Sequence, residues 1–185
     1  RIIADSDLDG LCAAAVLKTV NPTAEVIFAH AALIRSGAMD SQIDEHTAIV
    51  DLPFHENCGL YLDHHLTNRP TKKQEEEFVA RGGVCQWEAT PSAARLAYDL
   101  ISPFLDLSHL DEIMPIVDDI DSGGISKEDF LADGEILQLS RSLSLKHPEH
   151  LQHVLESLSN GVTLTDLLQE KHISKHVDKA KSDRI

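Results

Sequence analysis

The first twenty residues, RIIADSDLDGLCAAAVLKTV (1–20), decide the fold class. The apolar run 2–4 predicts a short buried strand, and a polar turn follows it as far as Gly10. The alanine-rich segment 11–20 then predicts a helix, which Asn21-Pro22 ends. The chain therefore begins with a strand, a turn and a helix.

Residues 25–101 continue this alternation. Thr90-Pro91 is a cap followed by proline at the first helical position, so 92–101 is predicted as a helix, whereas the polar segment 66–83 is predicted as a solvated helix or loop. Short continuous apolar runs between helices are typical of a parallel sheet covered on both faces. Further strands are predicted at 25–29, 48–50, 59–62 and 84–87.

The second half of the chain changes character. Its apolar residues recur at helical spacing, which predicts helices at 108–120, 127–145, 148–159 and 164–181. The expected fold class is therefore α/β: a mostly parallel sheet of about five strands flanked by helices, with a helical C-terminal half.

The composition, 42% hydrophobic and 25% charged over 185 residues, is that of a globular protein. No run approaches the ~18 apolar residues of a transmembrane helix. Three distant cysteines without a C-x-x-C pair favour a reducing cytoplasm.

The net charge of −15 and the 4% of aromatic residues argue against a broad nucleic-acid-binding face. An anionic substrate would need local neutralisation, which bound divalent cations would supply.

Acidic residues and histidines follow three of the predicted strands at the point where each strand ends. They are Asp5, Asp7 and Asp9 after the first strand, Asp51 after the third, and Asp63, His64 and His65 after the fourth. Because the carboxyl ends of parallel strands line one edge of a sheet, we expect these side chains to converge there.

The D-x-D-x-D-G string at 5–10 also resembles the start of an EF-hand loop. Such a loop needs a bidentate glutamate at its twelfth position, and that position is Val16 when Asp5 is the first. The EF-hand interpretation is therefore rejected.

The adjacent histidines are expected to have different roles, because neighbouring residues in an extended chain point to opposite sides. One of His64 and His65 can ligate a metal while the other faces substrate, and Asp63 can accept a ring N–H and fix a tautomer. Histidines elsewhere are interpreted as structural. These are His30, His46, His109, His147, His150, His153, His172 and His176.

A fourth acidic element, VDDIDSGG (117–124), closes a predicted helix. Carboxylates at a helix C-terminus oppose the helix dipole unless a cation is near. Asp118 and Asp121 share a face at helical spacing, and we favour Asp118 as a metal ligand. A solvated acidic helix end is the other interpretation.

Several carboxylates with one imidazole form a hard, oxygen-rich site, which suits manganese or magnesium better than zinc. Two such ions ~3.5–4 Å apart can share a bridging carboxylate and activate a water for in-line attack on phosphorus. Asp51, alone at its strand end, is the bridging candidate. The N-terminus of the helix that begins at Leu11 favours a phosphate nearby.

Four segments in this order resemble the motifs of the DHH phosphoesterase superfamily, which includes RecJ-type exonucleases, oligoribonucleases, exopolyphosphatases and family II pyrophosphatases. The segments are DSDLDG (5–10), IVD (49–51), DHH (63–65) and VDDIDSG (117–123). TPSAARLAYDL (90–100) resembles the helix that this family places after its third motif, so the resemblance covers roughly 1–123.

The resemblance implies a site for two Mn²⁺ ions, with Mg²⁺ as the other candidate. His65 would contact the scissile phosphate, Asp63 would support the histidine pair, and Asp5 stands where pyrophosphatase-like members carry a ligand histidine. The D-x-D-x-D-G form is nearer to the nuclease and oligoribonuclease branches. The implied metal ligands are Asp7, Asp9, Asp51, His64 and Asp118, and we add Asp5 to the candidate set.

We expect residues 1–124 to form the DHH catalytic core and 125–185 to complete the same domain. The family usually carries a second domain with a G-G-G-H-type motif; nothing after residue 124 resembles it, and the helix from Leu164 would suit a connector to it. The expected function is a metal-dependent phosphodiesterase acting on short oligonucleotides, dinucleotides or single-strand ends. An exopolyphosphatase or pyrophosphatase and a non-catalytic DHH scaffold are the alternatives. The oligomeric state is left open, a homodimer included.

Overall fold

A computed structural model describes residues 1–182. Its centre is a five-stranded sheet with the strand order β2-β1-β3-β4-β5, in which every pair of neighbours is parallel. The predicted α/β class is confirmed. The strands are β1 (Ile2–Asp5), β2 (Val26–Ala29), β3 (Ala48–Val50), β4 (Leu60–Asp63) and β5 (Val84–Trp87).

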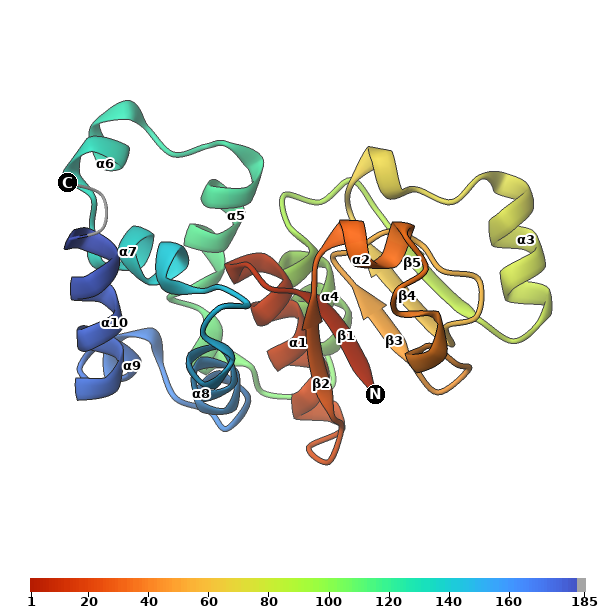
Figure 1. The fold of residues 1–185 in the computed structure, drawn as a ribbon, viewed down its shortest axis with the longest axis horizontal. Coiled ribbons are helices and arrows are strands. Elements are labelled where there is room, and N and C mark those ends of the chain that lie inside the picture. The colour runs from red at the N-terminus through yellow and green to blue at the C-terminus, as the bar shows by residue number, and fades with distance from the viewer. Residues whose placement is uncertain (183–185) are drawn as a thin grey trace.

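Helices surround the sheet and form the C-terminal part of the chain, which Figure 1 shows gathered on the side of the molecule away from α3. The helices described between residues 1 and 182 are all too short or too polar to cross a bilayer. They are α1 (Leu8–Val20), α2 (Ala31–Arg35), α3 (Lys72–Ala80), α4 (Ala93–Ile101), α5 (Met114–Ser122), α6 (Lys127–Ala132), α7 (Glu135–Ser142), α8 (Pro148–Ser159), α9 (Leu164–Leu168) and α10 (Lys171–Ser182).

The two faces of the sheet pack into two separate cores, because successive side chains of a strand point to opposite sides. Ile2 and Ala4 of β1 enter the larger core, which α1, α4, α5 and α8 complete. Ile3 lies on the other face, where it shares the smaller core with Tyr61 of β4 and Phe78 of α3. Burial on both faces explains why the strands are continuous apolar runs in the sequence.

Two of the long helices predicted in the second half are interrupted. The segment 127–145 is divided between α6 and α7, because Asp133 adopts a left-handed backbone conformation with φ 51° before Gly134. The segment 164–181 is divided between α9 and α10. The short helix α2 was not predicted at all.

Helix α1 begins earlier than predicted and brings Gly10 against the end of β1. A Cβ atom at this glycine would lie 2.4 Å from the backbone oxygen of Asp5, so the helix can approach the strand this closely only without a side chain there. We expect Gly10→Ala to lower the free energy of unfolding by about 1–3 kcal/mol, measured by urea denaturation. Gly134→Ala is the control, because a Cβ there meets no atom within 4 Å. Equal stability of the two variants would contradict this account of the packing.

Candidate metal centre

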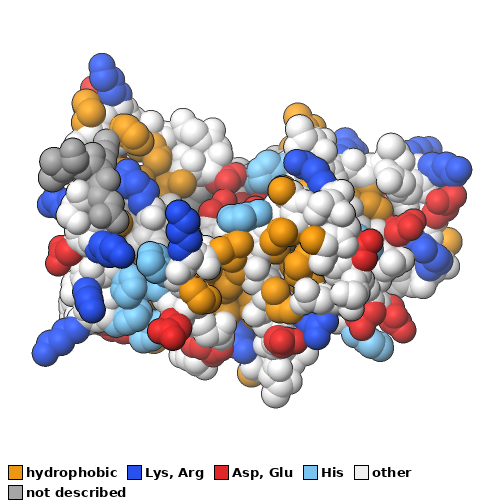
Figure 2. Space-filling model, in the orientation of Figure 1, with side chains coloured by type: hydrophobic (Ala, Val, Ile, Leu, Met, Phe, Trp, Pro, Cys, Tyr) orange, Lys and Arg blue, Asp and Glu red, His pale blue; other side chains and the backbone are white. Residues whose placement is uncertain are grey.

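The carboxyl ends of β1, β3 and β4 lie side by side at the point where the strand order reverses direction, between β1 and β3. In open parallel sheets, ligands bind in the crevice outside such a point. Asp51 directly follows β3, Asp63 ends β4, and Asp9 lies in the first turn of α1. Figure 2 shows acidic side chains and histidines gathered in a hollow of the surface near the centre of the molecule.

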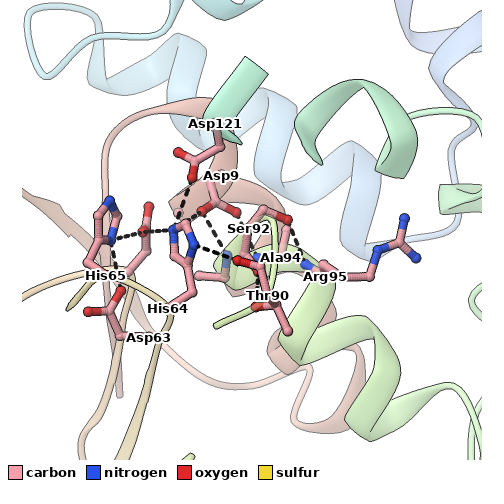
Figure 3. Close-up of polar contacts among 12 residues, drawn as sticks. Asp9, Asp63, His64, His65, Thr90, Ser92, Ala94, Arg95 and Asp121 are labelled. Carbon is pink, nitrogen blue, oxygen red and sulfur yellow. Dashed lines mark hydrogen bonds and ion pairs between the residues drawn. The ribbon is translucent and has the colours of Figure 1, made fainter. Parts of the chain in front are cut away.

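His64 lies at the middle of the cluster (Figure 3). Its Nε2 is 3.0 Å from Asp121 Oδ2, 3.4 Å from Asp9 Oδ2 and 3.8 Å from Asp51 Oδ1. Its Nδ1 is 3.0 Å from the backbone oxygen of Thr90 and therefore donates its hydrogen there. This bond leaves Nε2 as the nitrogen that faces the carboxylates, which is how metal-bound histidines are usually oriented.

The protonation of His64 responds to these carboxylates. Burial lowers its pKa, but the nearby carboxylates of Asp121 and Asp9 outweigh that effect and raise the pKa to about 10. Because Nδ1–H is committed to Thr90, Nε2 is the position at which a proton and a metal ion would compete.

Asp9 is buried and rigidly held, although it lies far in sequence from its partners. Its two carboxylate oxygens accept hydrogen bonds from the backbone N–H groups of Ala93 and Ala94, at 2.8 and 2.7 Å. Both amides belong to the first turn of α4, where N–H groups have no partner within the helix and attract negative charge. Each oxygen keeps further lone pairs for another ligand.

Asp51 carries the clearest sign of a missing positive charge. It is 4% exposed, and its Oδ1 has no hydrogen-bond partner among the described residues; the same holds for Nε2 of His64. Burial, followed by the charges of Asp9 and Asp7, raises the pKa of Asp51 well above its ordinary value. Buried polar atoms in native proteins are nearly always satisfied, so two such atoms 3.8 Å apart fit a cation between them.

His65 points to a different partner. Its Nδ1 is 3.0 Å from Oδ1 of the fully buried Asp63, whose Oδ2 accepts a hydrogen bond from the Tyr61 hydroxyl at 2.9 Å. The carboxylate therefore fixes the ring of His65, whose side chain remains 42% exposed. Tyr61 was not identified from the sequence. Its position two residues before Asp63 on the same strand, hence on the same face, was the available signal.

The structure places Asp121, and not the predicted Asp118, beside His64. Asp118 accepts hydrogen bonds from Arg95 of α4 at 2.7 and 2.9 Å and from Ser92 at 2.7 Å, so a guanidinium already balances its charge. Helix α5 extends to Ser122, beyond the predicted end, and carries Asp121 in its last turn. No pattern in the sequence indicated that Arg95 pairs with Asp118.

Asp5 and Asp7 lie at the margin of the cluster. Asp5 accepts a hydrogen bond from the backbone N–H of Ser6 at 2.6 Å and is 3.6 Å from Nδ1 of His30, while Asp7 caps α1 by accepting from Gly10 N at 2.9 Å. Among the described residues, two groups near the sheet edge have ligand atoms within 4.8 Å of one another, and neither includes Asp5 or Asp7. These groups are Asp9, His64 and Asp121, and Asp51, Asp63, His64 and His65.

We expect Tyr61→Phe to lower kcat by about 10-fold, the lower end of the effect of residues that orient a functional side chain, with little change in KM. The variant leaves Asp63 without the hydroxyl donor, so His65 is held less firmly. Steady-state kinetics would measure the effect. Tyr98→Phe is the matched control, because the Tyr98 hydroxyl donates to Asp111 near the surface. A loss of kcat that is equal in both variants would contradict the positioning role of Tyr61.

No family model and no curated protein sequence matches the chain. A solved structure described as the pGpG-specific phosphodiesterase PggH from Vibrio cholerae is similar to it, with a TM-score of 0.69 and 22% sequence identity. The likeness covers 96% of this chain and 58% of the Vibrio protein, so the chain spans less than two thirds of that protein's length. The chain therefore shares the fold of this part of the Vibrio protein.

Proposed function

We propose that this protein is a divalent-metal-dependent phosphodiesterase that hydrolyses short oligonucleotides, with dinucleotides as the favoured substrates. The observation that carries the proposal is the pair of buried atoms without hydrogen-bond partners, Asp51 Oδ1 and His64 Nε2, among several carboxylates. A scaffold would have no physical reason to retain this arrangement, because each such atom is destabilising until a ligand satisfies it.

The donor set fits two hard cations. Asp9, His64 and Asp121 would hold one ion, and Asp51 would bridge to a second one. Carboxylate-rich sites prefer manganese or magnesium, and Mn²⁺ is the favoured ion here. When bound, such a pair of ions supplies Lewis acidity and a water of lowered pKa for in-line displacement at phosphorus.

The protein's own residues position the substrate. His65, which Asp63 holds through Nδ1, has a 42% exposed side chain and would bind the scissile phosphate. The N-terminus of α1 adjoins the same sheet edge and favours a phosphate there. Asp5 and Asp7 lie at the margin of the cluster. They are proposed as further ligands of the metal ions when ions and substrate are bound.

A small substrate agrees with the charge of the chain. A net charge of −15 repels a long polyanion, whereas a dinucleotide presents few phosphates outside the metal centre. The similar Vibrio protein is described as specific for pGpG, which supports dinucleotides as the substrate class. The free cysteines Cys12, Cys58 and Cys85 support a cytoplasmic location for this activity.

The test is hydrolysis by the purified protein of three labelled substrates: pGpG, a single-stranded oligonucleotide and polyphosphate. Each is assayed with Mn²⁺, with Mg²⁺ and with a chelator. We expect Mn²⁺-dependent cleavage of pGpG, and slower cleavage of the oligonucleotide from its ends. Cleavage of polyphosphate alone would support a phosphoanhydride hydrolase instead, and no cleavage with either metal would support the scaffold.

A further inference from the structure

A second group of histidines lies far from the sheet edge, between α8 and α10. Figure 2 shows histidine side chains gathered on the face of the molecule where Figure 1 places α10. From the sequence alone, all of them were interpreted as structural. Neighbouring rings lie 4.0 to 6.0 Å apart, between centroids. The group consists of His147, His150, His153, His172 and His176.

We propose that His150, His172 and His176 form a binding site for a borderline divalent metal ion of the Zn²⁺ class, separate from the candidate metal centre. One ligand atom from each residue lies within 4.8 Å of the other two. His172 and His176 lie four positions apart on α10, which places them on one face of the helix. His150 joins them from α8.

The distance between two of the ligand atoms fits tetrahedral zinc. His150 Nδ1 and His172 Nε2 lie 3.3 Å apart. Zinc binds imidazole nitrogen at roughly 2.0–2.1 Å, so two ligands of a tetrahedral ion are separated by about 3.3–3.4 Å. These two nitrogens therefore already have the spacing that zinc requires.

The hydrogen bonds of His150 fix the tautomer that a metal needs. The Ser142 hydroxyl donates its hydrogen to the backbone oxygen of Leu139 at 2.6 Å. Its oxygen, 2.8 Å from His150 Nε2, therefore accepts from that nitrogen. The hydrogen of His150 lies on Nε2, and Nδ1 presents its lone pair toward His172. A ligating histidine is typically held in this way by a second hydrogen bond.

His176 is held in a comparable way. Its Nδ1 lies 3.0 Å from the backbone oxygen of His172 and donates to it, which leaves Nε2 as the ligand atom. The ring is stacked on that of His150, with centroids 4.0 Å apart and an interplanar angle of 4°. One ligand nitrogen of His176 already lies within 4.8 Å of those of His150 and His172.

The charge of the cluster suits a metal ligand set. Neutral imidazole is the form that binds metals, and the bond from His150 Nε2 to Ser142 leaves the lone pair of His150 on Nδ1. The carboxylate of Glu170, 2.5 Å from His153 Nε2, adds negative charge beside the site. Three nitrogen ligands select zinc over manganese or magnesium, which prefer the oxygen-rich site at the sheet.

The test is calorimetric titration of the whole chain with Zn²⁺ in excess Mg²⁺, which competes for the oxygen-rich site. We expect the wild type to bind one zinc ion that the double variant His172→Gln/His176→Gln binds at least ~100-fold more weakly. His46→Gln is the matched control, because His46 is exposed near the opposite end of the sheet strands and should leave zinc binding unchanged. Ser142→Ala should weaken binding by about 10-fold through loss of the fixed tautomer.

Circular dichroism of each metal-free variant shows whether its helices are retained. Should the double variant fail to fold, NMR of imidazole nitrogens in the ¹⁵N-histidine-labelled wild type decides. Zinc should then shift the ring signals of His150, His172 and His176 and leave that of His46 unchanged. Zinc binding equal to wild type in a folded double variant, or no zinc-dependent shift of these rings, would overturn the proposal. Either result leaves the proposed phosphodiesterase activity untouched, because the two sites share no residue.

Discussion

Asp51→Asn should nearly abolish hydrolysis while making the metal-free protein more stable. The carboxylate is buried, its Oδ1 is without a partner among the described residues, and the charges of Asp9 and Asp7 oppose its ionisation. Removing the charge relieves this repulsion. Asparagine also tolerates the left-handed backbone at this position, where φ is 56°. With Asp51 as the proposed bridging ligand, its loss should cost several kcal/mol of transition-state stabilisation, or about 10³-fold in kcat.

Two measurements on the same preparation test whether Asp51→Asn loses activity while it gains stability. The rate of pGpG hydrolysis in Mn²⁺ should fall by about 10³-fold. Urea denaturation in a chelator should show a higher free energy of unfolding than wild type, and added Mn²⁺ should stabilise the variant less. Asp40→Asn, which removes an exposed carboxylate, is the control and should change neither quantity by much. An Asp51→Asn protein that is destabilised and still binds Mn²⁺ normally would contradict a metal role for Asp51.

Asp121→Asn should also impair catalysis severely, whereas Asp118→Asn should mainly reduce stability. Asp121 Oδ2 lies 3.0 Å from Nε2 of His64. Because Asp121 is a proposed metal ligand, its loss should lower kcat by roughly 10²–10³-fold. Asp118 instead forms a two-point ion pair with Arg95, which joins α5 to α4. Its loss should cost about 1–2 kcal/mol of unfolding free energy.

The two asparagine variants are controls for each other, since they lie one helical turn apart on α5 and make the same chemical change. Steady-state kinetics at several Mn²⁺ concentrations separates them. Asp121→Asn should raise the Mn²⁺ concentration needed for half-maximal activity, and Asp118→Asn should leave it near the wild-type value. A raised Mn²⁺ requirement in Asp118→Asn, with a normal one in Asp121→Asn, would support Asp118 as the metal ligand, as predicted from the sequence.

The sheet could be predicted closely because its physical cause is local. The central strands β1, β3 and β4 are buried on both faces and therefore read as continuous apolar runs. The strands 48–50 and 84–87 were placed at the residues where the structure has them. The convergence of Asp9, Asp51 and His64 also followed, since parallel strands bring their carboxyl ends together. Long-range proximity was thus inferred without any knowledge of side-chain contacts.

Prediction from the sequence stopped where tertiary partners decide the outcome. Helical spacing puts Asp118 and Asp121 on one face, and only the position of Arg95 on α4 determines which carboxylate is already paired. The break between α6 and α7 depends on a left-handed backbone at Asp133, a residue type that merely tolerates that conformation. The histidine cluster joins residues from two helices that no sequence pattern pairs.

The two hydrogen bonds from backbone amides of α4 to Asp9 bear on which ions the candidate metal centre would bind. A carboxylate whose oxygens are each tied to an amide of α4 cannot move outward to fit a larger ion. The position of this carboxylate is thus set by the packing of α1 against α4. Magnesium binds oxygen at roughly 2.0–2.1 Å and calcium at roughly 2.3–2.6 Å. With Asp9 as a proposed ligand, a site built on such fixed carboxylates would accommodate small cations better than the calcium that a flexible cluster of aspartates would accept.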